Sequence, residues 1–263
     1  MRIRPIPFVG LSLSAAFAAA GLGAWAAGGA AQTTAQTATV AAKPDGTARQ
    51  TASPWTGAAD AFDIPGRDQK LQLPRVYRDL GIGKGSKVAD IGAGGGWLSV
   101  RLGFQVGPTG RVYAEEILPK FTAYIERRAK LSGLSNVETI LGTPTDPKLP
   151  AKALDAVVIL NAYHEFDQPL ALLSKVRAGL KSGGKLGILE RDDDTLRLQA
   201  RRAYEQTGRI LRRVSERNDG NPITDDHRLA LDVVRREGEK AGLRFVGSRE
   251  LGDDNYLAVF QAP

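Results

Sequence analysis

A short strand-like run followed at once by a glycine-rich loop constrains the fold of this chain more than any other feature. Residues 87–91 read KVADI, residues 92–96 read GAGGG, and a stretch with helical apolar spacing begins at Trp97. Glycines at such a turn let the backbone bend tightly and let a ligand approach without meeting a Cβ. The helix that follows presents free N–H groups to the same ligand. The pattern therefore predicts a strand–loop–helix unit that holds a ligand.

The alternation of strand and helix continues along the chain. Further strands are predicted over 111–115, 136–141, 154–160, 185–190, 243–248 and 255–261. Helices are predicted from Pro119 to near Gly133, after Asp167 with Leu170, Leu173, Val176 and Leu180 on one face, and over 228–241. Strands separated by helices predict an α/β fold with a doubly wound, Rossmann-like, mostly parallel sheet. Ligands of such sheets bind at the carboxyl ends of the strands.

Composition narrows the function classes that remain. The chain has 263 residues, of which 42% are hydrophobic and 25% charged, which suits one sizeable core. It has no Cys and two His, so a disulfide scaffold is excluded and no metal site is expected. The formal net charge is +7, but no clustered basic patch with aromatic stacking residues accompanies it, so no nucleic-acid partner is expected.

The first 31 residues have the layout of a secretory signal. Two arginines precede an uncharged apolar stretch, and small residues suited to cleavage follow it. A retained membrane anchor is the alternative, because the apolar stretch is long enough to span a bilayer. Either arrangement places the rest of the chain outside the cytoplasm, periplasmic or secreted if cleaved. Residues 32–60, rich in Thr, Ala and Gln, are predicted to be a flexible linker before one domain over 61–263.

The spacing of the glycines discriminates between ligand classes. A dinucleotide fingerprint would require a glycine where Trp97 stands, and no Gly-Lys-Ser/Thr follows to make a P-loop. The chain has D-x-G-x-G-x-G instead, from Asp90 to Gly96. An acidic pair, Glu115-Glu116, ends the next strand, where a carboxylate can accept hydrogen bonds from both hydroxyls of a ribose. The loop and the acid together indicate an adenosine-type ligand.

On these residues the chain resembles the class I S-adenosylmethionine-dependent methyltransferases. The matching segments are VADIGAGGGW (88–97), RVYAEEILP (111–119), GTPTDPKLP (142–150), LDAVVILNAYHEF (154–166), LKSGGKLGILE (180–190) and NYLAVFQ (255–261). They cover nearly all of 70–263 in order, and they look most like the small-molecule branch with Y-H-E-F after the fourth strand. The resemblance implies a seven-stranded sheet with an antiparallel last strand, and S-adenosyl-L-methionine as the cofactor.

The resemblance also implies which residues hold the cofactor. The residues that would hold the methionine end of the cofactor and approach its sugar are Asp90, Gly92, Ala93, Gly94 and Gly96. Glu116 aligns with the ribose-binding acid, where Glu replaces the usual Asp, and Glu115 is the alternative. Thr143 or Asp146 would flank the adenine, and Asn161 would lie under the methionyl group.

Two further features bear on catalysis and on the acceptor. His164 and Glu165, just past the fourth strand, are the candidate catalytic residues, with His164 as the base; the alternative is a histidine that only shapes the pocket. His227 is expected to cap or pack locally. Residues 191–226 form a helical insertion whose basic helix, 195–216, is either a cover or a lid that makes peripheral contact with anionic lipid or an acidic substrate.

These features predict an exported or tethered methyltransferase that uses S-adenosyl-L-methionine and acts on an unidentified small-molecule or lipid-like acceptor. One alternative is a catalytically silent protein of this fold that binds a nucleoside or lipid outside the cytoplasm, because fold alone does not establish turnover. Another is a membrane-surface interaction protein that uses the basic helix. The expected export conflicts with the cofactor, which is made in the cytoplasm.

Overall fold

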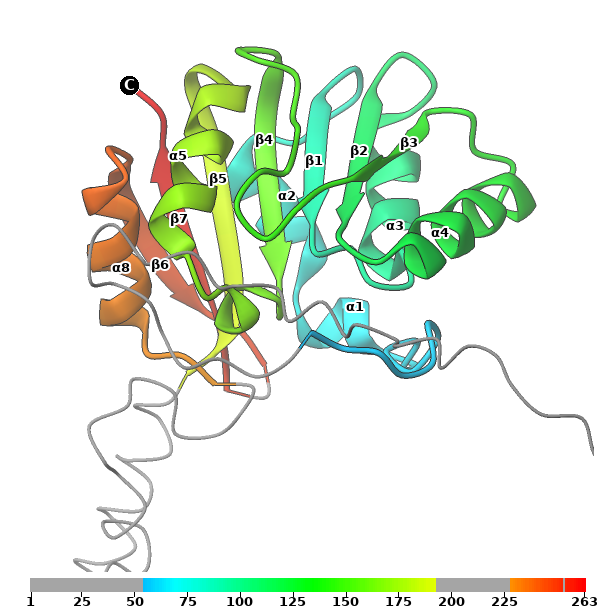
Figure 1. Cartoon of the computed structure of the whole chain (residues 1–263), viewed down its shortest axis with the longest axis horizontal. Coiled ribbons are helices and arrows are strands. Elements are labelled where there is room, and N and C mark those ends of the chain that lie inside the picture. The colour runs from blue at the N-terminus through cyan, green and yellow to red at the C-terminus, as the bar shows by residue number, and fades with distance from the viewer. Residues whose placement is uncertain (1–53, 193–227, 253) are drawn as a thin grey trace, which may run out of the picture. The chain divides into compact units, whose positions relative to one another are not determined.

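The computed structural model contains the predicted seven-stranded sheet, in the order β3-β2-β1-β4-β5-β7-β6 (Figure 1). The strands are β1 (Lys87–Ile91), β2 (Arg111–Glu116), β3 (Val137–Leu141), β4 (Leu154–Leu160), β5 (Leu180–Arg191), β6 (Arg244–Glu250) and β7 (Asn255–Gln261). β7 pairs antiparallel with both β5 and β6, whereas the pairs among β1 to β5 are parallel. The predicted mostly parallel sheet with an antiparallel last strand is confirmed.

The structure describes residues 54–192, 228–252 and 254–263. The expected signal or anchor (1–31), most of the expected linker, the basic helix 195–216 and His227 lie outside the described residues. Within the described ranges, no helix combines the length and the apolar character needed to cross a membrane.

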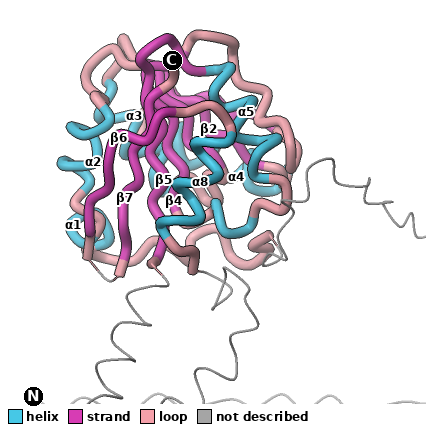
Figure 2. The backbone as a smooth tube through the Cα atoms, turned by 90° about the vertical axis from the view of Figure 1, so that its left-hand side faces the viewer, coloured by secondary structure: helices cyan, strands magenta, loops and turns pink. Residues whose placement is uncertain are grey.

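Helices cover both faces of the sheet, as Figure 2 shows. They are α1 (Arg67–Lys70), α2 (Leu73–Leu80), α3 (Trp97–Val106), α4 (Pro119–Leu131), α5 (Pro169–Gly179) and α8 (Leu231–Lys240). Successive side chains of a strand point to opposite faces. In β4, Val158 therefore packs with α2 and α3, whereas Val157 and Ile159 pack with α5 and α8. Burial on both faces explains why the central strands read as continuous apolar runs.

Several elements differ from the prediction, among them α1 and α2, for which no helix was predicted. β5 begins at Leu180 rather than Lys185, because Leu180 pairs with Leu154 before the register shifts. The helix predicted from residue 228 begins at Leu231, because Arg228 forms a bridge with Arg191 at the end of β5. A 3₁₀ turn, η1 (Tyr163–Glu165), follows β4 where no regular element was predicted.

Candidate active site

A cavity of about 390 Å³ lies at the carboxyl ends of β1, β2 and β4. This is the point where the strand order reverses, since the chain leaves β1 toward β2 on one side and β4 lies on the other. The walls come from the glycine loop, the end of β2, Thr143, residues 160–162 and the N-terminal segment 54–67. The cavity therefore lies where the sequence predicted the ligand.

The glycine loop forms one wall of this cavity, and the room for a side chain differs from one glycine to the next. Gly92 and Gly94 both have a left-handed backbone, with φ of 66° and 55°. A Cβ on Gly92 would lie 2.7 Å from the Cβ of Ala162 after β4, whereas a Cβ on Gly94 would meet nothing within 4 Å. The loop thus packs tightly against β4 at Gly92 and leaves open space at Gly94. Ala93 lines the cavity with them, but Gly96 does not.

Asp90, the last residue but one of β1, is almost fully buried, at 1% exposure. Ser99 Oγ donates a hydrogen bond of 2.6 Å to its Oδ2 atom. The pKa of Asp90 is raised to about 7: burial is the main cause and the nearby carboxylate of Glu116 also raises it, while the Ser99 hydrogen bond and the positive charge of Arg67 lower it. Asp90 is therefore a buried acid at the cavity wall, and a nearby cation stabilises its ionised form.

The two acids at the end of β2 are hydrogen-bonded to the glycine loop. Gly94 N–H donates to Glu116 Oε1 at 2.7 Å, and Gly92 N–H donates to Glu115 Oε2 at 3.3 Å. Glu116 Oε2 also accepts from Ile117 N–H at 2.9 Å. Within the described residues Glu115 Oε1 is buried without a hydrogen-bond partner, and burial raises the pKa of Glu115 to about 8. Both acids line the cavity.

The structure separates the two residues expected at the adenine. Thr143 and Asp146 exchange backbone hydrogen bonds of 2.9 and 3.2 Å, which makes a tight turn after β3. Thr143 lines the cavity and Asp146 does not. The Asp146 carboxylate instead accepts from Lys148 N–H at 2.9 Å and lies 3.7 Å from Lys175 Nζ. Thr143 is thus the member of the pair that can contact a ligand.

Asn161 is the first residue after β4 and has a left-handed backbone with φ of 48°. A non-glycine residue in this region is uncommon and carries strain, which occurs often at functional sites. Its backbone N–H donates to the Leu189 carbonyl at 2.8 Å. Its side-chain Oδ1 is buried and has no hydrogen-bond partner among the described residues. Asn161 thus brings an unused acceptor to the cavity wall.

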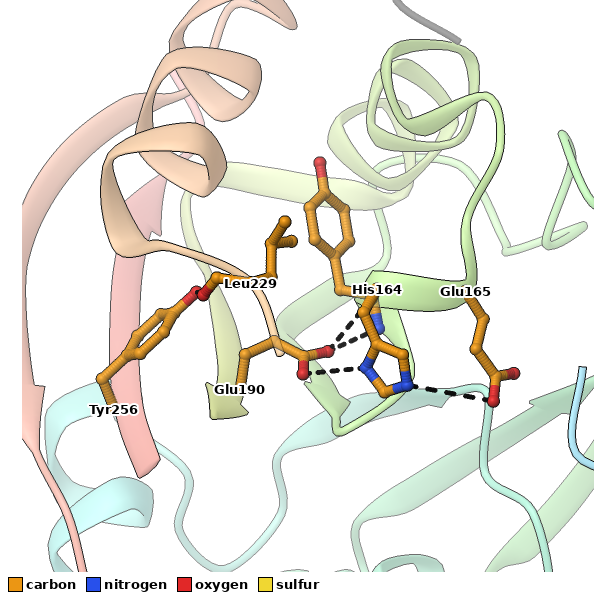
Figure 3. Close-up of polar contacts among 6 residues, drawn as sticks. His164, Glu165, Glu190, Leu229 and Tyr256 are labelled. Carbon is orange, nitrogen blue, oxygen red and sulfur yellow. Dashed lines mark hydrogen bonds and ion pairs between the residues drawn. The ribbon is translucent and has the colours of Figure 1, made fainter. Parts of the chain in front are cut away.

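Of the two candidate catalytic residues, only Glu165 lines the cavity. His164 is 2% exposed and its Nδ1 lies 3.0 Å from Glu190 Oε2, at the end of β5 (Figure 3). His164 Nε2 lies 4.0 Å from Glu165 Oε1. Burial raises the pKa of Glu165 to about 7. The histidine therefore lies behind the glutamate as seen from the cavity.

Comparison with known proteins identifies the fold and a methyltransferase domain. A family profile described as "Methyltransferase domain" matches residues 88–184. A solved S-adenosylmethionine-dependent methyltransferase from Aquifex aeolicus superposes with a TM-score of 0.63 at 22% identity, over 78% of this chain and 97% of that one. Residues 88–184 thus form a methyltransferase domain, and the described sheet has the fold of a class I S-adenosylmethionine-dependent methyltransferase.

Curated relatives match the methyltransferase domain over part of their length. A protein-L-isoaspartate O-methyltransferase of Ignicoccus hospitalis is 30% identical over 96 residues, which are 36% of this chain and 44% of the relative. A demethylmenaquinone methyltransferase of Geobacillus stearothermophilus is 28% identical over 121 residues, which are 46% of this chain and 52% of the relative. The chain spans about half the length of these relatives.

The structure also places at or next to the cavity two residues that the sequence did not point to, Arg67 and Glu190. Arg67, on α1, is the only cationic side chain among the described residues that line the cavity, and burial lowers its pKa to about 10. Its guanidinium lies 4.6 Å over the Trp97 ring. A single arginine in a stretch without a motif carried no signal. Glu190 ends the run KLGILE, so the sequence shows a charged residue at the end of a strand. The sequence does not show that it contacts Tyr163 and His164.

The segment 54–66 packs against the methyltransferase domain, although its first residues belong to the expected linker. Trp55 and Phe62 line the cavity, with their ring centroids 5.2 Å apart. Lys120 Nζ donates to the Thr56 carbonyl, and Arg128 pairs with Asp63. The cavity is therefore closed on one side by chain that precedes the first strand.

Proposed function

We propose that this chain transfers the methyl group of S-adenosyl-L-methionine to a small, largely apolar acceptor. The observation that carries the proposal is the hydrogen bonding of the glycine loop to the acids of β2 around one cavity. Gly92 and Glu115 are 23 residues apart in sequence, and Gly94 and Glu116 are 22 apart. Both pairs meet at the strand ends, where a nucleoside would bind. The names of the relatives give different acceptors, so we infer the class of acceptor from the side chains that line the cavity.

The residues present suit the groups of this cofactor. Glu116 accepts from Gly94 N–H at Oε1 and from Ile117 and Leu118 N–H at Oε2, so of about four acceptor positions one, on Oε1, is left for a ribose hydroxyl. The open space at Gly94 admits a ligand atom where a Cβ would otherwise stand. The unpartnered oxygens of Glu115 and Asn161 can accept from amino or hydroxyl donors. Arg67 can pair with the carboxylate of the methionyl group. When bound, the cofactor supplies an electrophilic methyl group on a sulfonium.

The rest of the wall favours an apolar acceptor. Its large apolar side chains include Trp55, Phe62, Phe121, Phe166 and Leu172. Such a surface binds an aromatic or aliphatic body and leaves orientation to a few polar groups. Methyl transfer requires the attacking atom to be held in line with the methyl group, so this packing would supply most of the catalysis. Demethylmenaquinone, named for one relative, is an acceptor of this kind.

Calorimetric titration of the purified full chain with S-adenosylmethionine and S-adenosylhomocysteine tests the cofactor site. We expect both to bind and Glu116→Ala to weaken both by at least about 10-fold, since hydrogen bonds to a charged group contribute about 1.5–3 kcal/mol. Glu138→Ala is the control, because that glutamate on β3 is exposed and does not line the cavity. A folded protein that binds neither compound would refute the proposal.

Turnover is tested separately with methyl-labelled cofactor and a panel of phenols and hydroquinones. Label recovered in an organic product supports methyl transfer. Tight cofactor binding without any labelled product would favour the catalytically silent alternative.

Arg67 gives a sharper test of how the cofactor lies in the cavity. Arg67→Met should weaken S-adenosylhomocysteine by about 10- to 100-fold and leave 5′-methylthioadenosine unchanged, because the latter has no carboxylate. Arg75→Met, at an exposed arginine of α2, should change neither affinity. Equal loss for both ligands would show that Arg67 does not contact the carboxylate.

We also propose that the domain works outside the cytoplasm. The support is the layout of residues 1–31, a basic start followed by an apolar stretch and small residues. An active enzyme there depends on cofactor that reaches it from the cytoplasm.

A further inference from the structure

The guanidinium of Arg67 lies against two aromatic rings in the cavity wall. Its Cζ is 4.6 Å from the centroid of the Trp97 ring and 5.7 Å from that of the Phe62 ring. Both distances are within the range at which a cation is attracted to the face of an aromatic ring. Arg67 Nη1 also donates to the Phe62 carbonyl at 3.2 Å. Phe62 and Trp97, which line the cavity with Arg67, thus form an aromatic clamp on the guanidinium.

The fold fixes the Trp97 half of this clamp. Trp97 is 6% exposed and belongs to the apolar core on the α2 and α3 side of the sheet, whereas Phe62 is 40% exposed. Arg101, four residues further along α3, has its Cζ 3.9 Å from the centroid of the same indole ring. Its Nη1 donates to the Trp97 carbonyl at 3.0 Å. The indole therefore lies against two guanidinium groups, of which only that of Arg67 lines the cavity.

Arg67 has hydrogen-bond donors that the described residues do not use. The bond to the Phe62 carbonyl is the only one that its guanidinium makes there, and no carboxylate of those residues forms an ion pair with it. Asp90 acts on its charge through space, and the like charge of Arg101 opposes that effect. A partly buried cation without a paired anion is costly. The arrangement therefore favours a ligand that brings an anionic group to this part of the wall.

We infer that Trp97 is a positioning residue, which holds the Arg67 guanidinium in the orientation that binds the carboxylate at the amino-acid end of the cofactor. The inference deepens the proposed function and rests on it. A planar guanidinium binds a carboxylate best through two parallel N–H···O bonds, so its orientation matters. A ring packed in the core sets that orientation before the ligand arrives, which lowers the cost of ordering on binding. This gives a role to the bulky residue that directly follows the glycine loop.

Calorimetric titration of the full chain with S-adenosylhomocysteine and with 5′-methylthioadenosine separates this role from support of the fold, because only the first compound has the amino-acid end. We expect Trp97→Leu to weaken S-adenosylhomocysteine by about 3- to 20-fold, as for loss of a cation–π contact, and to leave 5′-methylthioadenosine unchanged. Trp97→Phe keeps an aromatic face and should retain most of the affinity. Phe104→Leu is the matched control, because that side chain of α3 is exposed and does not line the cavity.

A double variant tests whether the tryptophan acts through the arginine. If it does, Arg67→Met combined with Trp97→Leu should bind S-adenosylhomocysteine no more weakly than Arg67→Met alone, because residues that share one interaction have non-additive effects. Additive losses would show that Trp97 acts independently of Arg67 and would overturn the inference.

Equal loss of both ligands in Trp97→Leu would also overturn it, because Trp97 would then contact the nucleoside or support the loop as a whole. So would full affinity of a folded Trp97→Leu for S-adenosylhomocysteine. Circular dichroism identifies a variant that does not fold, and Trp97→Met, with a larger apolar side chain, then carries the same expectations. Failure here leaves both ligands bound by the wild type, whereas a wild-type chain that binds neither refutes the proposed function and this inference with it.

Discussion

Four carboxyl groups in the cavity wall have raised pKa values: Asp90 at about 7, Glu115 at about 8, Glu165 at about 7, and Glu116, whose pKa is raised as well. Burial is the main cause for each, since it disfavours the charged form. In the unfolded chain these groups have pKa values near 4. Between about pH 4 and 8 the folded protein therefore binds more protons than the unfolded chain, and its stability falls as pH rises through that range.

We therefore expect the Tm of the ligand-free protein to fall between pH 5 and pH 9, as measured by calorimetry or circular dichroism. Glu115→Gln should make this fall shallower, because a neutral amide replaces the group with the highest of these pKa values. Glu138→Gln, at an exposed position, should leave the slope unchanged. A Tm that rises across the range would contradict the pKa shifts.

Residues tied to the ends of consecutive strands were predictable, because parallel strands bring their carboxyl ends to one edge. Asp90, Gly94 and Glu116 could be placed in this way from spacing alone. Arg67 and Glu190 could not, because their positions depend on packing between segments far apart in the sequence. His164 was predicted near the site, but its burial behind Glu165 follows from η1, a turn with no sequence signature.

At the scale of elements, the contact between the segment 54–66 and the glycine loop is unusually close. A Cβ on Gly95 would overlap the backbone oxygen of Ala59, a group that cannot rotate away. Arg128 reinforces the contact by donating to the Gly95 carbonyl at 2.6 Å. The segment thus stays against the loop only because residue 95 has no side chain.

Gly95→Ala should therefore displace the segment 54–66 while the sheet remains folded. We expect faster amide hydrogen exchange in that segment and weaker binding of S-adenosylhomocysteine, since Trp55 and Phe62 would leave the cavity wall. Gly83→Ala is the matched control, because a Cβ there would meet nothing within 4 Å. Unchanged exchange in the segment would show that the contact is not required.

Most element bounds followed from local patterns, and the exceptions have a tertiary cause. β4 was predicted over 154–160 as observed, since its apolar run ends at the polar Asn161. The start of β5 was not, because Gly183 and Gly184 are typical of a turn and only pairing with β4 holds this part in the sheet. The fold of residues 54–66 has no apolar periodicity and depends on the surface beneath it.

At the scale of the whole molecule, export is the prediction that the N-terminal sequence makes. A reporter enzyme that is active only outside the cytoplasm should become active when fused after residue 60. The same reporter fused to a chain that begins at residue 61 should stay inactive. Activity of both fusions, or of neither, would contradict the proposed location.

The place of β7 has a consequence for the order in which the molecule assembles. β7 comes after every other strand in the chain, yet it lies between β5 and β6 in the sheet. A ribosome or a translocation pore delivers residues from the N-terminus, so β6 emerges before the only described strand that it pairs with. Until residues 255–261 arrive, β5 presents an open edge, which is prone to aggregation. The cofactor half, built on β1, β2 and β4, can thus assemble before the sheet itself is closed.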